Sequence, residues 1–317
     1  MQGLIGITRI YWKRAAILLA TGLLFPLTVI QSGEQDKPKR PRITRIDHLR
    51  LYVIDVNKSR EFYKSILGLP ELGGCIGHTD ACFTIFWNPR QAIELEPARS
   101  SEIKNWVAEI SFATDDISQM RRYLAGHGVK CGSIEQKYSS AHFRVADPEG
   151  NVIGFVQRNA SANDDPSPPP PNQVGTRLLH AGFVVRDIAA ENRFYVDLLG
   201  FKVYWQGGMK DDGLDWYELQ VPDGDNWIEY MLNIPANADH KALGAQNHFS
   251  FGVRNIEAAA EQLPKNGATK IAGPGIGRDG KRGLNVYDPD DTRVEVTEFT
   301  PAREPCCHPY TAAHPTP

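Results

Sequence analysis

Four residues in the C-terminal half of this chain have the side-chain types and the spacing of a metal site. His180 and His248 each lie early in a short apolar segment (LLHAGFVV and QNHFSFGV). Glu229 and Glu295 lie in two further segments of this kind (NWIEYML and TRVEVTEF). Nearly the same interval separates each histidine from the glutamate that follows it, which indicates one unit used twice. We therefore predict that the four side chains converge on one point.

Two imidazoles and two carboxylates suit a divalent metal ion such as Zn, Ni, Co, Mn or Fe and leave positions open for water or substrate oxygens. Taken singly, a histidine in a strand is more often a hydrogen-bonded core residue than a ligand. A glutamate in a strand often simply lies on the face of the strand that is exposed to solvent. Four coincidences at equivalent positions of a repeat favour the metal site.

The segments that carry these residues belong to a fourfold repeat. Each copy starts with a strand-like segment, continues with a helical pattern preceded by Asp or Asn and followed by glycine, and ends in further strands. The four first strands lie in the segments RIDHLRLYV, WVAEISFAT, LLHAGFVV and QNHFSFGV. We predict an α+β fold of four βαβββ modules, paired two by two into two domains.

Composition marks the domain boundaries. Residues 159–176 break all periodicity and contain four consecutive prolines, which is typical of an extended linker. The predicted domains are therefore 44–158 and 177–300, preceded by a flexible lead at 33–43. Residues 301–317 are rich in Cys, His and Pro, and we expect a disordered tail. The adjacent thiols of Cys306 and Cys307 also suit copper or zinc.

The sequence resembles the vicinal oxygen chelate superfamily, which includes glyoxalase I, methylmalonyl-CoA epimerase, extradiol dioxygenases and bleomycin-resistance proteins. The resemblance is carried by H-x-x-[FL]-x-V after His48 and His180, by F-Y-x-x-x-L-G-[LF] in Phe62–Leu69 and Phe194–Phe201, and by D-P-x-[GD] before the last strands. It implies that two βαβββ units curl around a cleft, with metal ligands on the first and last strands of each unit. The frame hosts many activities and therefore fixes none of them.

The matching positions of the N-terminal domain are His48, Glu94, Glu109 and Gly154. Glycine cannot ligate a metal, and glutamate stands at the third position, where the resemblance implies histidine. We therefore predict His48, Glu94 and Glu109 only as weaker candidates for a second site. The N-terminal domain is interpreted as degenerate, with a structural or regulatory role.

The complete ligand set favours a metal-dependent, glyoxalase-like lyase or isomerase acting on a small substrate. A bound ion polarises a carbonyl group and stabilises the enediolate that forms when a proton leaves the adjacent carbon. The resemblance implies that Glu229 or Glu295 is the catalytic base. Export, predicted below, fits poorly with glutathione as the thiol, since glutathione is mainly cytosolic.

Two alternatives stay open. His180, His248 and Glu295 also form the two-histidine, one-carboxylate triad of non-haem Fe(II) dioxygenases. The resemblance implies a further histidine before the final Tyr-x-x-Asp-Pro stretch for catechol cleavage, and the segment GIGRDGKRGLNVYDPDD has none. A non-catalytic small-molecule binding or resistance protein would need no metal, which suits residues 44–158 better than the C-terminal half.

Substrate contacts are predicted from a glycine-rich loop. Arg278, Lys281 and Arg282 lie just before a strand, where they would meet an anionic substrate, although a solvated loop explains them equally well. Trp216 and Trp227 are candidates to line the cleft or to fill the core.

Charge and the N-terminus bear on partners and location. A net charge of −3 and a pI near 6.3 argue against a nucleic-acid partner, and oligomeric state is not predicted. Basic residues precede the uncharged run AAILLATGLLFPLTVI, the pattern of a secretory signal. Residues 1–32 are therefore predicted to be a signal peptide or an uncleaved membrane anchor. The folded part is expected to be exported, either periplasmic or secreted.

Overall fold

The computed structural model describes residues 39–73, 83–100, 103, 105–137, 140–159 and 168–317. The predicted signal peptide or anchor, most of the flexible lead and the middle of the linker lie outside these residues. Within the described ranges, no helix has the length and apolar character needed to cross a membrane.

The described chain contains four βαβββ modules, and the fold prediction is confirmed. The first comprises β1 (Ile43–Val53), α1 (Val56–Glu61), the π-helix η1 (Phe62–Ile66), β2 (Glu71–Gly73), β3 (Phe83–Asn88) and β4 (Gln91–Pro97). The second comprises β5 (Val107–Thr114), α2 (Ile117–Gly126), β6 (Glu135–Lys137), β7 (Ser140–Ala146) and β8 (Val152–Arg158). The third comprises β9 (Arg177–Val184), α3 (Ile188–Asn192), the π-helix η2 (Arg193–Leu198), β10 (Lys202–Gly207), β11 (Trp216–Gln220) and β12 (Trp227–Met231). After α4 (His240–Gln246), the fourth comprises β13 (His248–Val253), α5 (Ile256–Lys265), β14 (Ile271–Ile276), β15 (Arg282–Tyr287) and β16 (Arg293–Glu298).

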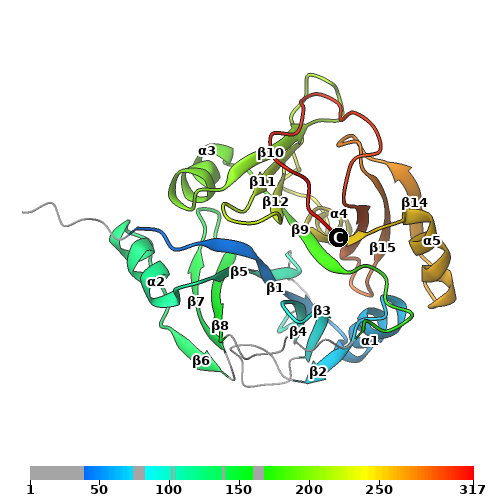
Figure 1. Ribbon diagram of the computed structural model, residues 1–317, viewed down its shortest axis with the longest axis horizontal. Helices are drawn as coiled ribbons and strands as arrows, with labels where there is room; N and C mark the ends of the chain where they lie inside the picture. The colour runs from blue at the N-terminus through cyan, green and yellow to red at the C-terminus, as the bar shows by residue number, and fades with distance from the viewer. Residues whose placement is uncertain (1–38, 74–82, 101–102, 104, 138–139, 160–167) are drawn as a thin grey trace, which may run out of the picture. The chain divides into compact units, whose positions relative to one another are not determined.

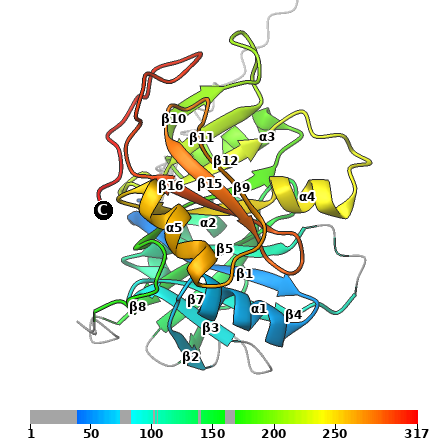
Figure 2. The ribbon, with the colours of Figure 1, turned by 90° about the vertical axis from the view of Figure 1, so that its right-hand side faces the viewer.

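Within each half, the two modules form one eight-stranded sheet (Figures 1 and 2). The strand orders are β2-β3-β4-β1-β5-β8-β7-β6 and β10-β11-β12-β9-β13-β16-β15-β14. The first strand of every module pairs in parallel with the last strand of the same module. The two first strands of each half pair antiparallel with each other. The first and last strands of both modules are therefore four neighbours at the centre of each sheet.

The helix that follows the first strand of each module begins directly after a capping side chain. The side chains of Asp55, Asp116, Asp187 and Asn255 accept backbone N–H groups from the first turn of the helix that follows each of them. Gly200 and Gly267 follow two of the helices with φ of +79° and +100°, a backbone region that glycine adopts at little cost. Local chemistry thus helps to set the ends of these helices.

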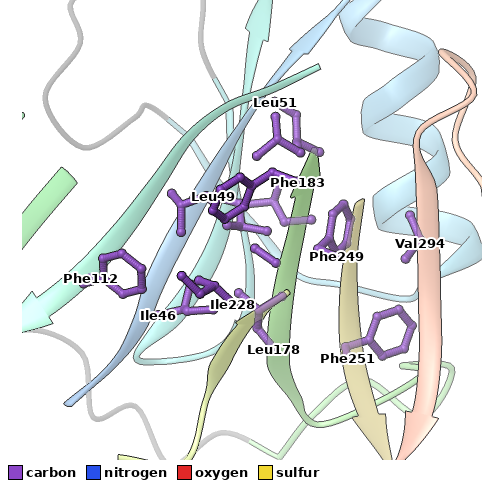
Figure 3. Packing of buried hydrophobic residues seen from close by; sticks show 14 of the residues in the cluster. Ile46, Leu49, Leu51, Phe112, Leu178, Phe183, Ile228, Phe249, Phe251 and Val294 are labelled. Carbon is purple, nitrogen blue, oxygen red and sulfur yellow. The ribbon is translucent and has the colours of Figure 1, made fainter. Parts of the chain in front are cut away.

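The two halves share one hydrophobic core. Leu49 and Phe112 of the N-terminal sheet belong to the same buried cluster as Phe183 and Phe249 of the C-terminal sheet (Figure 3). The expected extended linker therefore connects halves that pack on each other. The last residues of the linker belong to this packing, since Val174 is buried and its N–H donates to Leu67 O.

Two equivalent hydrogen bonds join the halves. Tyr63 Oη donates to Asp288 at 2.8 Å, and Tyr195 Oη donates to Asp147 at 3.1 Å. Each tyrosine comes from the F-Y motif of one half, and each aspartate comes from the Asp-Pro turn of the other half. The motifs that carry the family resemblance thus also build the contact between the halves.

Both ends of the described chain differ from expectation. β1 begins at Ile43, which is fully buried although it falls within the predicted flexible lead. Residues 301–317, expected to be a disordered tail, pack against the C-terminal half: Thr311 N–H donates to Tyr204 O at 3.0 Å, and the Tyr310 ring lies 4.8 Å from the Tyr204 ring. The expectation of disorder is wrong because it rested on proline content and could not include contacts with distant aromatic residues.

Glu191 of α3 is a buried carboxyl group close to the contact between the halves. Its Oε1 accepts the Glu149 N–H at 3.0 Å, while its Oε2 has no hydrogen-bond partner. Burial, together with the nearby Asp147 carboxylate, raises the pKa of Glu191 to about 8. An unfolded chain would ionise this group near pH 4.5, so its contribution to stability is lost as the pH rises from about 4.5 to about 8.

We predict that Glu191→Gln raises the free energy of unfolding at pH 8 relative to wild type by at least about 1 kcal/mol, since one pKa unit corresponds to about 1.4 kcal/mol. At pH 4.5 the two proteins should be equally stable, because Glu191 is then protonated in the folded state. Urea unfolding at both pH values measures the difference, with the exposed helical Glu261→Gln as control. An equal effect of Glu191→Gln at the two pH values would contradict the assignment.

Candidate metal centre

The C-terminal sheet brings the four predicted residues together. Glu229, His180, His248 and Glu295 lie on the four adjacent central strands β12, β9, β13 and β16. His180 Nε2 lies 3.1 Å from His248 Nε2 and 3.3 Å from Glu295 Oε2. His248 Nε2 lies 3.1 Å from Glu229 Oε2. The ligand atoms of His180, His248 and Glu295 all lie within 4.8 Å of one another.

The two imidazoles face this point as uncharged rings. The Nδ1 atom of His248 lies 2.9 Å from Gln246 O, a carbonyl that only accepts, so Nδ1 carries the proton and Nε2 faces the other ligands. Burial lowers the pKa of His248 to about 3 and holds the pKa of His180 well below its ordinary value. Both rings are therefore neutral at pH 7, the form that binds a metal ion.

The carboxylates differ in their surroundings. Burial raises the pKa of Glu229 to about 7. Glu295 has a cationic neighbour, since Arg293 Nη1 donates to its Oε1 at 3.2 Å. A divalent ion between two neutral imidazoles and two acidic groups would supply the positive charge that Glu229 lacks, so the donor set fits such an ion.

Gly182 makes room for the centre. It lies on β9, in register with both Glu229 of β12 and His248 of β13. A Cβ atom at this position would lie 2.1 Å from Cε1 of His248. The space that the His248 ring occupies therefore depends on the absence of a side chain at residue 182.

A cavity of about 390 Å³ opens beside the centre. Trp216 and Trp227, both proposed from sequence, line it together with Trp205. The Trp227 ring also packs 4.9 Å from the His180 ring. Aromatic walls of this kind favour a small substrate with an apolar part.

Only two of the three predicted cationic residues line this cavity. Arg278 and Lys281 do so, and Lys281 Nζ donates to Tyr310 Oη at 2.7 Å. The guanidinium of Arg282 instead forms an ion pair with Glu257 of α5. The prediction for Arg282 is therefore not supported, because its side chain at the start of β15 is held by α5 instead of lining the cavity.

Glu218 is a cavity residue that sequence reasoning missed. It lies on β11 directly opposite Glu229 of β12, is buried, and its Oε2 has no hydrogen-bond partner. Burial holds its pKa well above the ordinary value. The alternation in the segment DWYELQV could have placed Glu218 on the same face as Trp216, but only the register shows that it faces Glu229.

The N-terminal half places the weaker candidates at the equivalent points, but a guanidinium lies between them. Arg50 occupies the position on β1 that Gly182 occupies on β9, in register with Glu94 and Glu109. Its Nη2 donates to Glu94 at 2.8 Å, and its Nη1 donates to Glu109 at 2.6 Å. His48 Nε2 is 3.9 Å from each carboxylate. Arg50 therefore provides the positive charge that a metal ion would provide.

Glu109 is adapted to this arrangement. Although its burial opposes ionisation, Arg50 and Arg144 lower its pKa to about 2. Gly154, at the fourth ligand position, leaves space for it, because a Cβ atom there would lie 2.4 Å from Glu109 Oε1 and 2.0 Å from Ser111 Oγ. This geometry agrees with the interpretation of the N-terminal domain as degenerate.

Among the described residues, one further set of potential ligands lies close together, namely Asp211, Cys306 and Cys307. The two sulfur atoms are joined in a disulfide bond and so offer no thiolate to a metal.

Comparisons with known proteins agree with this architecture. A family model described as the Glyoxalase/Bleomycin resistance protein/Dioxygenase superfamily matches residues 45–155 and 177–296. A Bacillus subtilis (strain 168) protein described as "Uncharacterized protein YwbC" is 30% identical over 126 residues, which are 36% of this chain and 98% of that protein. The "Probable lactoylglutathione lyase, chloroplastic" of Arabidopsis thaliana is 26% identical over 133 residues, 41% of this chain and 38% of that protein.

Solved structures of similar fold include two dioxygenases. The 2,3-dioxygenase LapB from Pseudomonas sp. KL28 has a TM-score of 0.63 and 16% identity, covering 88% of this chain and 96% of that chain. A substrate complex of homoprotocatechuate 2,3-dioxygenase from Brevibacterium fuscum has a TM-score of 0.61 and 18% identity, covering 87% and 84%. At these identities the likeness shows the fold alone.

We predict that Gly182→Ala weakens binding of Zn²⁺ or Ni²⁺ at least about tenfold, since the added methyl group displaces the His248 ring. Calorimetric titration of the purified chain measures the affinity. Gly154→Ala is the matched control: it crowds Glu109 in the same way in the other half and should lower stability without weakening metal binding. Equal metal affinities for wild type and Gly182→Ala would contradict the proposed role of this glycine.

A second prediction concerns the buried ion pairs of the N-terminal half. Arg50→Met should lower the free energy of unfolding by about 3–5 kcal/mol, because it leaves Glu94 and Glu109 buried without their central cation. Adding Glu94→Gln to Arg50→Met should recover part of this loss. Denaturant unfolding measures both variants. A loss below about 1 kcal/mol would show that Arg50 does not neutralise the cluster.

Proposed function

Because the chain belongs to the Glyoxalase/Bleomycin resistance protein/Dioxygenase superfamily, we propose that residues 177–300 bind one divalent metal ion and catalyse a glyoxalase-like lyase or isomerase reaction. The substrate is a small molecule in which a proton leaves the carbon next to a carbonyl group. The observation that supports this proposal is the convergence of a second carboxylate, Glu229, on the pair of imidazoles that already faces Glu295.

The surroundings of the two carboxylates suggest different roles. His180, His248 and Glu295 would hold the ion, since their ligand atoms all lie within 4.8 Å of one another and Arg293 donates a hydrogen bond to Glu295. The metal, which we expect to be Zn, Ni, Co, Mn or Fe, would polarise the substrate carbonyl and stabilise developing negative charge. Glu229 then accepts the proton from the adjacent carbon and returns it to the product, beside the tryptophan residues that line the cavity.

The alternative is a non-haem Fe(II) dioxygenase that uses His180, His248 and Glu295 as its triad. The dioxygenases of similar fold favour it, but at their identities this support concerns the fold. Among the described residues that line the cavity, His180 is the one histidine, so the site offers no further imidazole for acid–base work on a catechol. The third alternative, a non-catalytic binding protein, applies to the N-terminal half, where Arg50 fills the equivalent position.

The test compares wild type, His248→Ala and Glu229→Gln as full-length chains. Wild type should hold about one divalent ion per chain and convert α-keto aldehydes in the presence of a thiol. His248→Ala should lose the metal. Glu229→Gln should keep most of it while kcat falls by about 10²–10⁴, the usual contribution of a general base.

The other outcomes separate the alternatives. Oxygen-sensitive Fe(II) together with ring cleavage of catechols would replace the lyase proposal by the dioxygenase. Failure of wild type to retain any of the five metals would overturn both enzyme proposals and leave a binding protein. Metal loss in Glu229→Gln, equal to that in His248→Ala, would show that Glu229 is a required ligand rather than the base.

A further inference from the structure

The chain beyond β16 lies along the wall of the cavity. We call residues 301–317 the C-terminal strap. It runs back over the loop between β14 and β15 and alongside β10 (Figures 1 and 2). Ala302 N–H donates to Gly280 O at 2.9 Å, and Cys306 N–H donates to Arg278 O at 2.8 Å. The strap is thus bonded to the loop that supplies Arg278 and Lys281 to the cavity.

Tyr310 of the strap contacts two residues of this cavity wall, Lys281 and Asp279. Its hydroxyl accepts a hydrogen bond from Lys281 Nζ at 2.7 Å and donates to Asp279 Oδ2 at 3.2 Å. The Lys281 ammonium lies 4.5 Å from the centre of the Tyr310 ring and 4.6 Å from that of Trp227. Since Lys281, Asp279 and Trp227 all line the cavity, the strap holds cavity residues that it does not itself contribute.

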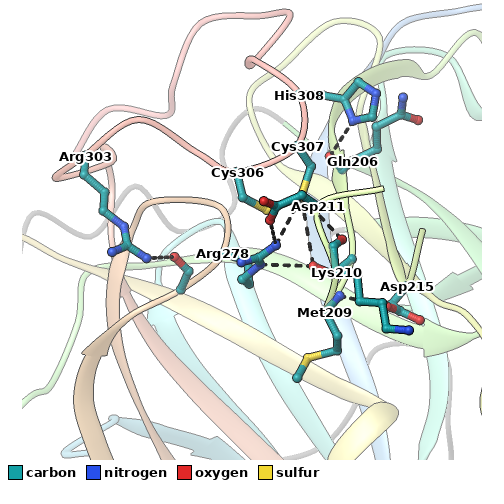
Figure 4. The surroundings of a disulfide bond; sticks show 12 residues. Gln206, Met209, Lys210, Asp211, Asp215, Arg278, Arg303, Cys306, Cys307 and His308 are labelled. Carbon is teal, nitrogen blue, oxygen red and sulfur yellow. Dashed lines mark hydrogen bonds and ion pairs between the residues drawn. A yellow bond between two sulfur atoms is a disulfide. The ribbon is translucent and has the colours of Figure 1, made fainter. Parts of the chain in front are cut away.

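A disulfide bond lies at the point where the strap meets Arg278. Cys306 and Cys307, adjacent in sequence, are joined to each other, and the Arg278 Nη2 atom lies 3.6 Å from the Cys307 sulfur. Arg278 also donates to Gly208 O at 3.0 Å and pairs with Asp211 (Figure 4). The backbone of Cys307 has φ of +71°, a conformation that a residue other than glycine rarely adopts unless its surroundings hold it.

From these contacts we propose that Cys306 and Cys307 form a redox modification site, which we call the latch. Its disulfide bond holds the strap in the conformation that contacts the cavity wall. In the oxidised form the bond between the two sulfur atoms fixes the chain where it bonds to Arg278. A small dithiol opens the latch: its two thiols become a cyclic disulfide, and their two hydrogen atoms and two electrons pass to the sulfurs of Cys306 and Cys307. The two cysteine thiols then separate to van der Waals distance, and the hydrogen bonds of Cys306 and Arg278 loosen together.

The consequence is a cavity rim that depends on the redox state of the surroundings. An exported location, which the N-terminal sequence predicts, would keep the latch closed. In a reducing compartment the strap and the loop between β14 and β15, which contains Arg278, would open locally. The inference concerns the wall alone, so it does not depend on which metal the centre binds or which reaction it catalyses.

The test is peptide-resolved hydrogen exchange of the full-length chain, oxidised and then reduced with dithiothreitol. Alkylation with iodoacetamide follows the redox state of the strap peptide: no label before reduction and two labels after it. We expect amide exchange within residues 301–317 and 277–282 to accelerate at least about tenfold on reduction. Exchange in the N-terminal sheet, for example in β5, should not change.

Two variants make the result specific. Cys306→Ser/Cys307→Ser should exchange without reductant as fast as reduced wild type and should not respond to dithiothreitol. Cys131→Ser, which removes a free thiol of the other half, should behave like wild type. Unchanged exchange of the strap after both thiols have been labelled would overturn the proposal, as would two labels on the strap peptide of protein treated with an oxidant.

Discussion

The parallel pairing of the first and last strand within each module is the constraint on which the rest of this structure depends. It places β12, β9, β13 and β16 side by side at the centre of one sheet, so that one residue from each strand reaches a common point. Because the side chains come from rigid, buried strands, the imidazoles of His180 and His248 are held 3.1 Å apart without flexible loops. The loops and the strap then shape only the cavity beside them.

The two halves meet the same electrostatic requirement in different ways. Acidic groups buried at the centre of a sheet need a positive charge nearby, or they take up protons. In the N-terminal half the chain supplies that charge through Arg50, and Gly154 leaves space for Glu109. In the C-terminal half Gly182 occupies the position equivalent to Arg50, and the His248 ring fills the space that a side chain at residue 182 would need. Without a cationic side chain at this position, burial raises the pKa of Glu229. In each half a glycine leaves the space that the arrangement needs, but the glycine stands at a different position in the two halves.

The modules and the four converging residues are predictable from the repeat, because the nearly equal intervals from His180 to Glu229 and from His248 to Glu295 indicate equivalent positions in two similar units. What sequence could not supply was register and long-range packing. The partners of Arg50 and the position of Glu218 opposite Glu229 depend on which residues face each other across neighbouring strands. Likewise, the sequence groups Arg282 with its neighbour Lys281, but the ion pair of Arg282 with Glu257 of α5 depends on packing that the sequence does not show. The proline content of residues 301–317 predicts disorder, whereas the packing of the Tyr310 ring on the Tyr204 ring orders them.

The most direct test of the central claim is X-ray absorption spectroscopy of the full-length chain loaded with one equivalent of Zn²⁺. The four-residue centre predicts a first shell of nitrogen and oxygen at about 2.0–2.2 Å with scattering from two imidazole rings. The imidazole scattering should disappear in His180→Ala/His248→Ala. A shell that contains sulfur at about 2.3 Å, or one without imidazole, would place the ion elsewhere and contradict the account.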